Sequence, residues 1–242
     1  LGEIDKVRNW IKAKILPTIL PSTHMYEYAE RKIYKDEILK KHILSFLHKA
    51  DFNISGINSE IVKNTISSDM MKYIESSSIP ENEKEKLKKE GTYDSIKTSF
   101  IHKVTNERGD EEYSFNEYQQ SIGTKRMIGV ETAIYEAVST SAFLCIDEFE
   151  SSLHPELMEF LIQKFLESNK SQSQLLISTH CLELQNLIGD LIRKDSVWFT
   201  EKDESGNTDL YSLIEFSGLN KMSSILKSYK NGKFGAKPDI KN

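Results

Sequence analysis

The sequence predicts an α/β fold with a parallel sheet, and two short apolar runs carry this prediction. The first run is Phe143–Ile146 and the second is Leu175–Ser178. Each has the length and apolar character of a strand that is buried in a sheet. A helical pattern that begins at Pro155 separates them. Because strands that alternate with helices favour parallel pairing, we expect both runs to belong to one parallel sheet.

The amino-terminal part of the chain is expected to be mainly helical. Apolar residues recur at helical spacing in residues 3–16 and 25–50, and a further helix is predicted near Ser59–Ile74. Residues 76–93 are polar and rich in charge, which is typical of a mobile linker with a short charged helix. We therefore assign residues 1–94 to a helical arm or inserted lobe.

The remaining residues, 95–242, are predicted to form the α/β lobe. A β-hairpin is expected from Ser95–Val104 and Glu111–Phe115, with its turn at residues 106–110. A helix over Gly123–Thr140 then precedes the first apolar run.

Two helices and a second hairpin complete the predicted lobe. Pro155 at a first-turn position opens a helix that is predicted to reach Ser168. Another helix is expected over Leu182–Arg193. Ser196–Glu201 and Leu210–Glu215 are predicted to pair as the hairpin.

Composition excludes several classes of protein. The 242 residues are 38% apolar and 29% charged, which fits a core with a charged surface. No window approaches the run of apolar residues that a membrane span needs, and no signal segment is visible. With two cysteines, neither a disulfide framework nor a zinc quartet is expected, and a cytoplasmic location follows.

Charge is distributed unevenly, although the net charge is only −5. Residues 1–50 contain ten lysines or arginines and six acids. A basic segment of this kind attracts nucleic acid in some proteins, but it is more often a solvated helical face. Nucleic acid therefore stays an open partner.

An acidic pair, Asp147 and Glu148, directly follows the first apolar run. Ligand sites of open α/β sheets lie just beyond the carboxyl ends of their strands. Neighbouring side chains point in alternate directions, so one carboxylate can hold a cation while the other faces a reacting water. The plainer interpretation is a core strand that runs into a solvated acidic turn.

Two further features favour a site. Ser178-Thr179-His180 ends the second apolar run, so His180 is expected at the same edge of the sheet as Glu148. Ser121-Ile122-Gly123-Thr124 opens the helix that precedes the acidic pair. A serine hydroxyl, a flexible glycine and a helix amino terminus together make an anion site, although an ordinary helix cap is the simpler alternative.

These features, in this order, resemble the carboxyl-terminal half of an ABC-type ATPase. The resemblance implies ATP and Mg²⁺ as cofactors, with Asp147 on the metal through a coordinated water. It assigns Glu148 to polarising the attacking water and His180 to the terminal phosphate. The ATPase resemblance thus predicts a metal–phosphate centre at the strand tips.

The same resemblance implies a dimer. Ser121, Gly123 and Thr124 match the signature turn, which closes over nucleotide bound to a partner subunit. Leu153-His154-Pro155 lies where these ATPases place a loop at the dimer seam, with His154 in place of the acid common in transporters. A homodimer or higher oligomer with composite sites is therefore expected.

One part of such an ATPase is absent from the sequence. None of the eleven glycines belongs to a Gly-x-x-x-x-Gly-Lys-Ser/Thr phosphate loop (Walker A). The loop is expected upstream of Leu1 or on another polypeptide, and a degenerate site is the third alternative. The intact acidic pair and His180 disfavour degeneration.

Several further stretches carry a closer resemblance: Glu148–Pro155, Asp195–Lys202, Leu210–Leu213 and Tyr229–Pro238, together with Leu47–Ile54. They resemble the prokaryotic AAA_21/AAA_15 group of SMC-related ATPases, of the RloA, abortive-infection and overcoming-lysogeny-like types. This resemblance implies an ATP-hydrolysing subunit in bacterial antiphage defence that acts with an effector, a nuclease or a toxin. A non-hydrolysing scaffold and a DNA-repair ATPase are the alternatives.

Overall fold

The computed structural model describes residues 2–50, 52–107, 109–168 and 172–237. It divides the chain into two compact units. The flanking unit comprises residues 1–21 and 140–242, and the insert unit comprises residues 22–139. The sequence-based boundary between residues 94 and 95 falls inside a strand of the insert unit. Arg108 of the predicted turn and Pro238 lie outside the described residues.

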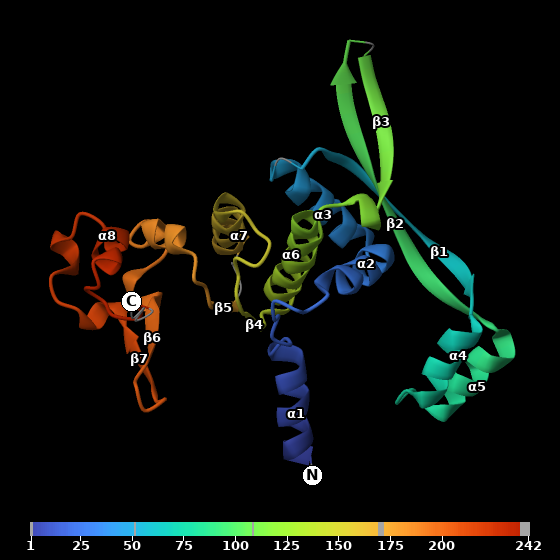
Figure 1. Ribbon diagram of the computed structural model, residues 1–242, viewed down its shortest axis with the longest axis horizontal. Coiled ribbons are helices and arrows are strands. Elements are labelled where there is room, and N and C mark those ends of the chain that lie inside the picture. The colour runs from blue at the N-terminus through green and yellow to red at the C-terminus, as the bar shows by residue number, and fades with distance from the viewer. Residues whose placement is uncertain (1, 51, 108, 169–171, 238–242) are drawn as a thin grey trace. The chain divides into compact units, whose positions relative to one another are not determined.

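A small parallel sheet organises the flanking unit (Figure 1). Strands β4 (Phe143–Ile146) and β5 (Gln174–Ile177) pair in parallel, with Ile146 opposite Ile177. Residues 15–19 run parallel to β4 through bridges at both ends of the segment. The two strands expected in one parallel sheet are thereby confirmed.

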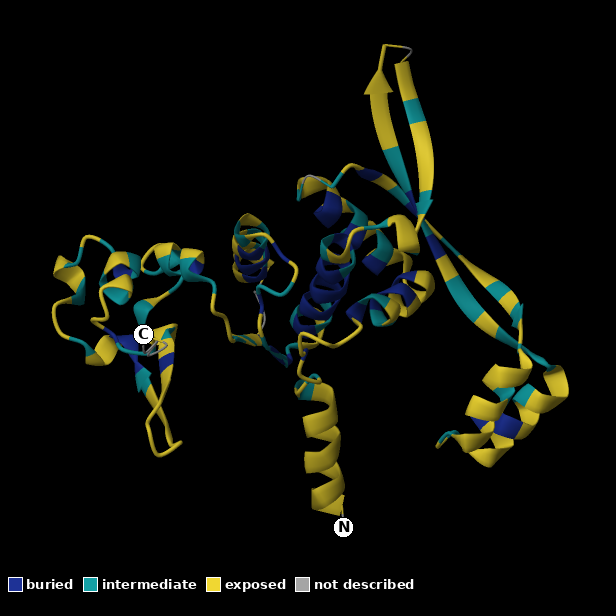
Figure 2. Ribbon diagram, in the orientation of Figure 1, coloured by how far each residue is buried: buried dark blue, intermediate teal, exposed yellow. Residues whose placement is uncertain are grey.

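Helix α7 (Pro155–Ser168) connects these two strands, with the bounds that the sequence predicts. Its buried residues recur on one face: Met158, Leu161, Ile162 and Phe165. This spacing is that of an amphipathic helix packed against a core. By contrast, α1 (Gly2–Lys14) has no buried residue (Figure 2).

The carboxyl-terminal part of the flanking unit contains the second predicted hairpin. Strands β6 (Trp198–Lys202) and β7 (Thr208–Ser212) pair antiparallel, and α8 (Ile225–Lys230) follows. Phe199, Leu213, Ile225 and Phe234 form their shared buried core. Short 3-10 turns occur at Glu117–Gln119 in the insert unit and at Lys194–Ser196, Leu213–Glu215 and Leu219–Lys221 here.

The helix predicted over Leu182–Arg193 is wrong. The chain forms a 3-10 helix at Leu182–Leu187 and then turns back on itself. Gly189 has a φ of +103°, which no α-helical residue adopts, and its N–H donates to the carbonyl of Ile192 over 2.7 Å. The glycine therefore ends the helical pattern that the apolar residues suggest.

The insert unit combines helices with a long antiparallel sheet. Helix α2 (Met25–Lys35) and α3 (Glu37–Lys49) are separated at Asp36, whose carboxylate caps α3 by accepting from two backbone N–H groups. Strands β1 (Ile54–Thr65), β2 (Thr92–Asn106) and β3 (Gly109–Asn116) follow in the order β1-β2-β3. The first predicted hairpin is thus confirmed as β2 and β3.

One prediction for this region needs correction. The helix near Ser59–Ile74 begins only at Ser68, because the preceding residues pair along β2 as strand β1. Residues 1–94 are therefore not uniformly helical. The short charged helix expected within residues 76–93 is confirmed as α5 (Glu81–Glu90), which packs beside α4 (Ser68–Ser76).

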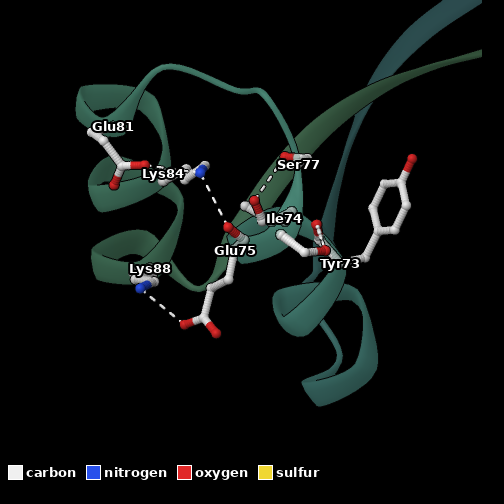
Figure 3. A network of polar contacts seen from close by, with 8 residues as sticks. Tyr73, Ile74, Glu75, Ser77, Glu81, Lys84 and Lys88 are labelled. Atoms are coloured by element: carbon white, nitrogen blue, oxygen red, sulfur yellow. Dashed lines mark hydrogen bonds and ion pairs between the residues drawn. The ribbon is translucent and has the colours of Figure 1, made fainter.

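An ionic network fixes α5 to α4 (Figure 3). The ammonium group of Lys84 is 3.1 Å from the carbonyl of Glu75 and 2.9 Å from a carboxylate oxygen of Glu81. Lys88 forms an ion pair of 2.9 Å with the Glu75 carboxylate. Lys84 is only 8% exposed, so its charge is stabilised by these oxygens.

Helix α6 (Ile122–Thr140) lies in the core of the insert unit and contributes Ile128 to its main apolar cluster. No helix in the described parts of the chain is long and apolar enough to cross a membrane.

Gly129 of α6 lies against α2, and a Cβ placed on it would be 3.0 Å from the backbone carbon of Met25. The close contact leaves no space for a side chain at position 129.

We predict that Gly129→Ala lowers the free energy of unfolding by about 1–3 kcal/mol, because the added methyl group forces α2 away from α6. Urea unfolding followed by circular dichroism measures this. Gly2→Ala in α1 is the control, since a Cβ there meets no atom within 4 Å. Equal stability of the two variants would contradict the close packing.

Candidate functional site

The residues after β4 and β5 leave the parallel sheet at the same edge. Ile146 and Ile177 are register partners, so Asp147 and Ser178 are the first residues beyond each strand. The N–H of Ser178 donates to the carbonyl of Ile146 over 3.0 Å, which extends the ladder by one step. The acidic pair and the Ser178-Thr179-His180 segment therefore share one strand-tip region.

Ser178 ties the two strand tips together. Its hydroxyl donates a short hydrogen bond to Oδ1 of Asp147 and accepts the N–H of Glu148 over 3.1 Å. Its carbonyl accepts the N–H of Phe149 over 3.0 Å. Sequence reasoning gave Ser178 no role, although a serine directly after an apolar strand was a usable signal.

The backbone after Asp147 adopts a tight, strained turn. Glu148 has a φ of +44°, and Ser152 has a φ of +60°. A non-glycine residue in this left-handed region costs about 1 kcal/mol or more, and such strain concentrates at functional sites. The carbonyl of Glu148 accepts the N–H of Ser151 over 2.8 Å, which closes the turn. The Glu148 side chain is exposed to solvent.

His180 is held at this edge through its backbone. Oε1 of Glu150 accepts the His180 N–H over 2.7 Å, while the His180 side chain is exposed. Burial raises the pKa of Glu150, but hydrogen bonds from the Thr179 side chain and the His180 N–H outweigh it, so the pKa lies below its usual range. Among the described residues, Ser178 and Glu150 make the hydrogen bonds that join the two tips.

The oxygen atoms at the strand tips fit a hard cation with few protein ligands. Asp147 is half-buried, and the Ser178 hydroxyl lies against its carboxylate. Within the described ranges no three His, Cys, Asp or Glu side chains converge as a metal site. Mg²⁺ suits this arrangement, because it keeps several waters and binds through one or two carboxylates plus phosphate oxygens.

The Ser121 turn belongs to the insert unit, where it caps α6. The Ser121 hydroxyl accepts the N–H of Thr124 over 3.0 Å and lies 2.8 Å from the Thr124 hydroxyl. Thr124 is buried, whereas Ser121 and Ile122 are exposed. The structure therefore presents Ser121 to solvent at a helix amino terminus and uses Thr124 to position it. Gly123 lies between these two environments, half-buried.

His154 lies at the start of α7 in the flanking unit. Its side chain is exposed, and its Nδ1 accepts the N–H of Glu156 over 3.4 Å. The His154 carbonyl accepts the N–H of Leu157 over 2.9 Å as the first turn of the helix forms. The imidazole is thus accessible at the surface.

Comparison with protein families identifies the domain. Residues 18–184, well over half of the chain, match the AAA_21 model, described as an AAA domain and linked in that description to the AbiEii toxin of a type IV toxin–antitoxin system. The chain belongs to the AAA_21 family. It therefore contains a nucleotide-binding domain of the ATPase type. The matched range of this AAA_21 domain includes both strand tips and the Ser121 turn. None of the curated proteins matches the chain.

We predict that Glu150→Gln lowers the free energy of unfolding by about 1 kcal/mol at pH 7, because a charged acceptor is lost. The folded-state pKa of Glu150 is depressed, so its contribution is present above the ordinary glutamate pKa of about 4.3 and is lost as pH falls further. Urea unfolding at pH 7 and at pH 3 should show the difference from wild type shrinking with acid. A pH-independent difference, or an equal loss in the exposed Glu159→Gln control, would refute this account.

Proposed function

We propose that this AAA_21 domain binds and hydrolyses ATP with Mg²⁺ at the β4–β5 strand tips. The observation that carries the proposal is the linkage of Asp147, Ser178 and Glu148 beyond two adjacent parallel strands. Phosphoryl chemistry depends on positioning and on charge stabilisation, and a rigid sheet edge supplies a fixed position. Membership in the AAA_21 family by itself gives only an ATPase-type domain.

Each residue at the strand tips has a proposed role. Asp147 would hold Mg²⁺, and the Ser178 hydroxyl orients its carboxylate. When bound, Mg²⁺ neutralises phosphate charge. Glu148 accepts a proton from the attacking water, and its exposed carboxylate is free to meet substrate from solvent. His180 contacts the terminal phosphate with its exposed imidazole.

The flanking unit exposes two apolar surfaces that a further segment of polypeptide could cover. We propose that this segment carries the phosphate loop and completes the site. In the described part of the chain, β5 has a partner strand only on its β4 side, and Leu176 is 54% exposed. A parallel strand of apolar residues is normally covered. Helix α1 also exposes an apolar set: Ile4, Val7, Trp10 and Ile11. We propose that a strand leading into the phosphate loop adds beside β5.

A second copy of the chain would complete the active site. Ser121 and Gly123 form the proposed closing turn, because the amino terminus of α6 offers N–H groups and positive potential to a phosphate. His154 is exposed at the start of α7 and is proposed to lie at the seam. The dimer would couple ATP turnover to a toxin or nuclease effector in antiphage defence, in keeping with the toxin–antitoxin link in the family description.

We predict that Glu148→Gln lowers ATP turnover at least ~100-fold and prolongs the ATP-bound dimer, because the proton acceptor is removed while shape is kept. Phosphate release and size-exclusion chromatography with ATP measure the two effects, in an assembly that includes the phosphate loop. Glu159→Gln, an exposed change on α7, is the matched control and should leave both unchanged. Undiminished turnover in Glu148→Gln would remove Glu148 from the mechanism.

We predict that Ser121→Arg abolishes ATP-dependent dimerisation, because a bulky side chain occupies the turn that closes over the partner's nucleotide. Analytical ultracentrifugation with and without ATP measures this. Ser67→Arg is the control, since Ser67 is also an exposed helix cap of the insert unit and accepts the N–H of Met70 over 3.2 Å. If both variants dimerise normally with ATP, the turn has no part in closure.

A further inference from the structure

A cavity of about 350 Å³ lies in the carboxyl-terminal part of the flanking unit, apart from the strand-tip residues. Its lining consists of aromatic rings, two carboxylates and a glycine: Tyr211, Phe216, Phe234, Glu201, Glu215 and Gly235. The volume is near the lower end of the range of about 300–1,000 Å³ for ligand sites. It suits one side chain or a small group better than a nucleotide.

The aromatic rings that line the cavity contact one another. The rings of Phe216 and Phe234 meet edge to face with centroids 5.0 Å apart, and those of Tyr211 and Phe216 do so at 5.8 Å. The Tyr211 hydroxyl is 2.7 Å from the Phe234 carbonyl. Phe234 is only 1% exposed, so the wall is anchored in the core.

Two carboxylates give this cavity a negative rim. Oε2 of Glu201 lies 3.2 Å from the Tyr211 hydroxyl, and Oε1 of Glu215 accepts the Ser212 N–H over 2.8 Å. Burial and then the Glu201 contact raise the pKa of Tyr211 to about 12, so its hydroxyl remains protonated. Within the described residues, neither Glu201 nor Glu215 forms an ion pair with a lysine, an arginine or a histidine.

Gly235 leaves space for the Glu201 carboxylate. It has a φ of +65°, and a Cβ there would lie 2.7 Å from Oε2 of Glu201 and 2.7 Å from the Tyr211 hydroxyl. Any side chain would therefore displace both groups. The glycine of the Gly-x-Phe-Gly stretch thus preserves the shape of the rim.

We propose that this cavity binds an arginine side chain of a partner polypeptide. Aromatic faces with nearby carboxylates attract cations, and a planar guanidinium both stacks on rings and pairs with carboxylate oxygens. Charge complementarity selects the ligand, because two carboxylates at an aromatic cavity have no cation from the described chain. The site serves partner recognition and does not depend on ATP hydrolysis at the strand tips.

The test is a titration of the ¹⁵N-labelled protein with the peptide acetyl-Gly-Arg-Gly-amide, followed by amide chemical shifts. The matched probe contains citrulline, a neutral isostere of arginine. We expect saturable shifts at Tyr211 and Gly235 with the arginine peptide, and at least fivefold weaker binding of the citrulline peptide. Equal binding of both peptides, or no saturable shift with arginine, would overturn the proposal.

Substitutions of the two rim carboxylates test whether they bind the arginine peptide. The double substitution Glu201→Gln with Glu215→Gln should weaken arginine binding at least fivefold, while glutamine oxygens still accept the hydrogen bonds of Tyr211 and Ser212. Glu159→Gln should bind as wild type. Gly235→Ala should also lose binding, and the double variant keeps the test valid if Gly235→Ala does not fold. Unchanged affinity in a folded double variant would overturn the proposal.

Discussion

Parallel pairing of β4 with β5 is the constraint on which the candidate site depends. The pairing places Asp147 and Ser178 side by side, and the Ser178 hydroxyl then joins the Asp147 carboxylate to the N–H of Glu148. The backbone of Glu148 has a strained, positive φ. The hydrogen bonds of Ser178 and the β4–β5 pairing fix its neighbours and so stabilise this conformation. A shift of one residue in register would turn these side chains to opposite faces of the sheet.

Much of this arrangement could be predicted from the sequence, because its signals are local. Phe143–Ile146 is apolar and ends in two acids, and Pro155 marks the first turn of α7. Strand–helix–strand order then implies parallel pairing, so a shared edge for Asp147 and His180 follows from topology. The position of Ser178 after an apolar strand was a signal, but its partners were not visible from local sequence, because they lie across the two strands.

The insert unit was harder to predict because its sheet is built from distant segments. Val62, Ile66 and Met70 recur at spacings that fit one face of a helix, yet Val62 lies in strand β1 and pairs with β2. Local spacing therefore gave no signal for this pairing. The helix predicted over residues 182–193 was wrong for a different reason. Gly189 has a positive φ, which ends the helix that the apolar pattern otherwise favours.

Chemistry and recognition place different demands on the flanking unit. Reacting groups need fixed positions, which parallel strands and backbone hydrogen bonds supply at Asp147 and Glu148. A cation-binding cavity needs a carboxylate held in a defined position beside apolar surface. Tyr211 and Gly235 meet that need, one by hydrogen bonding to Glu201 and the other by leaving space for it. The β6–β7 hairpin and the turn at Gly235 can therefore serve a partner without altering the strand-tip geometry.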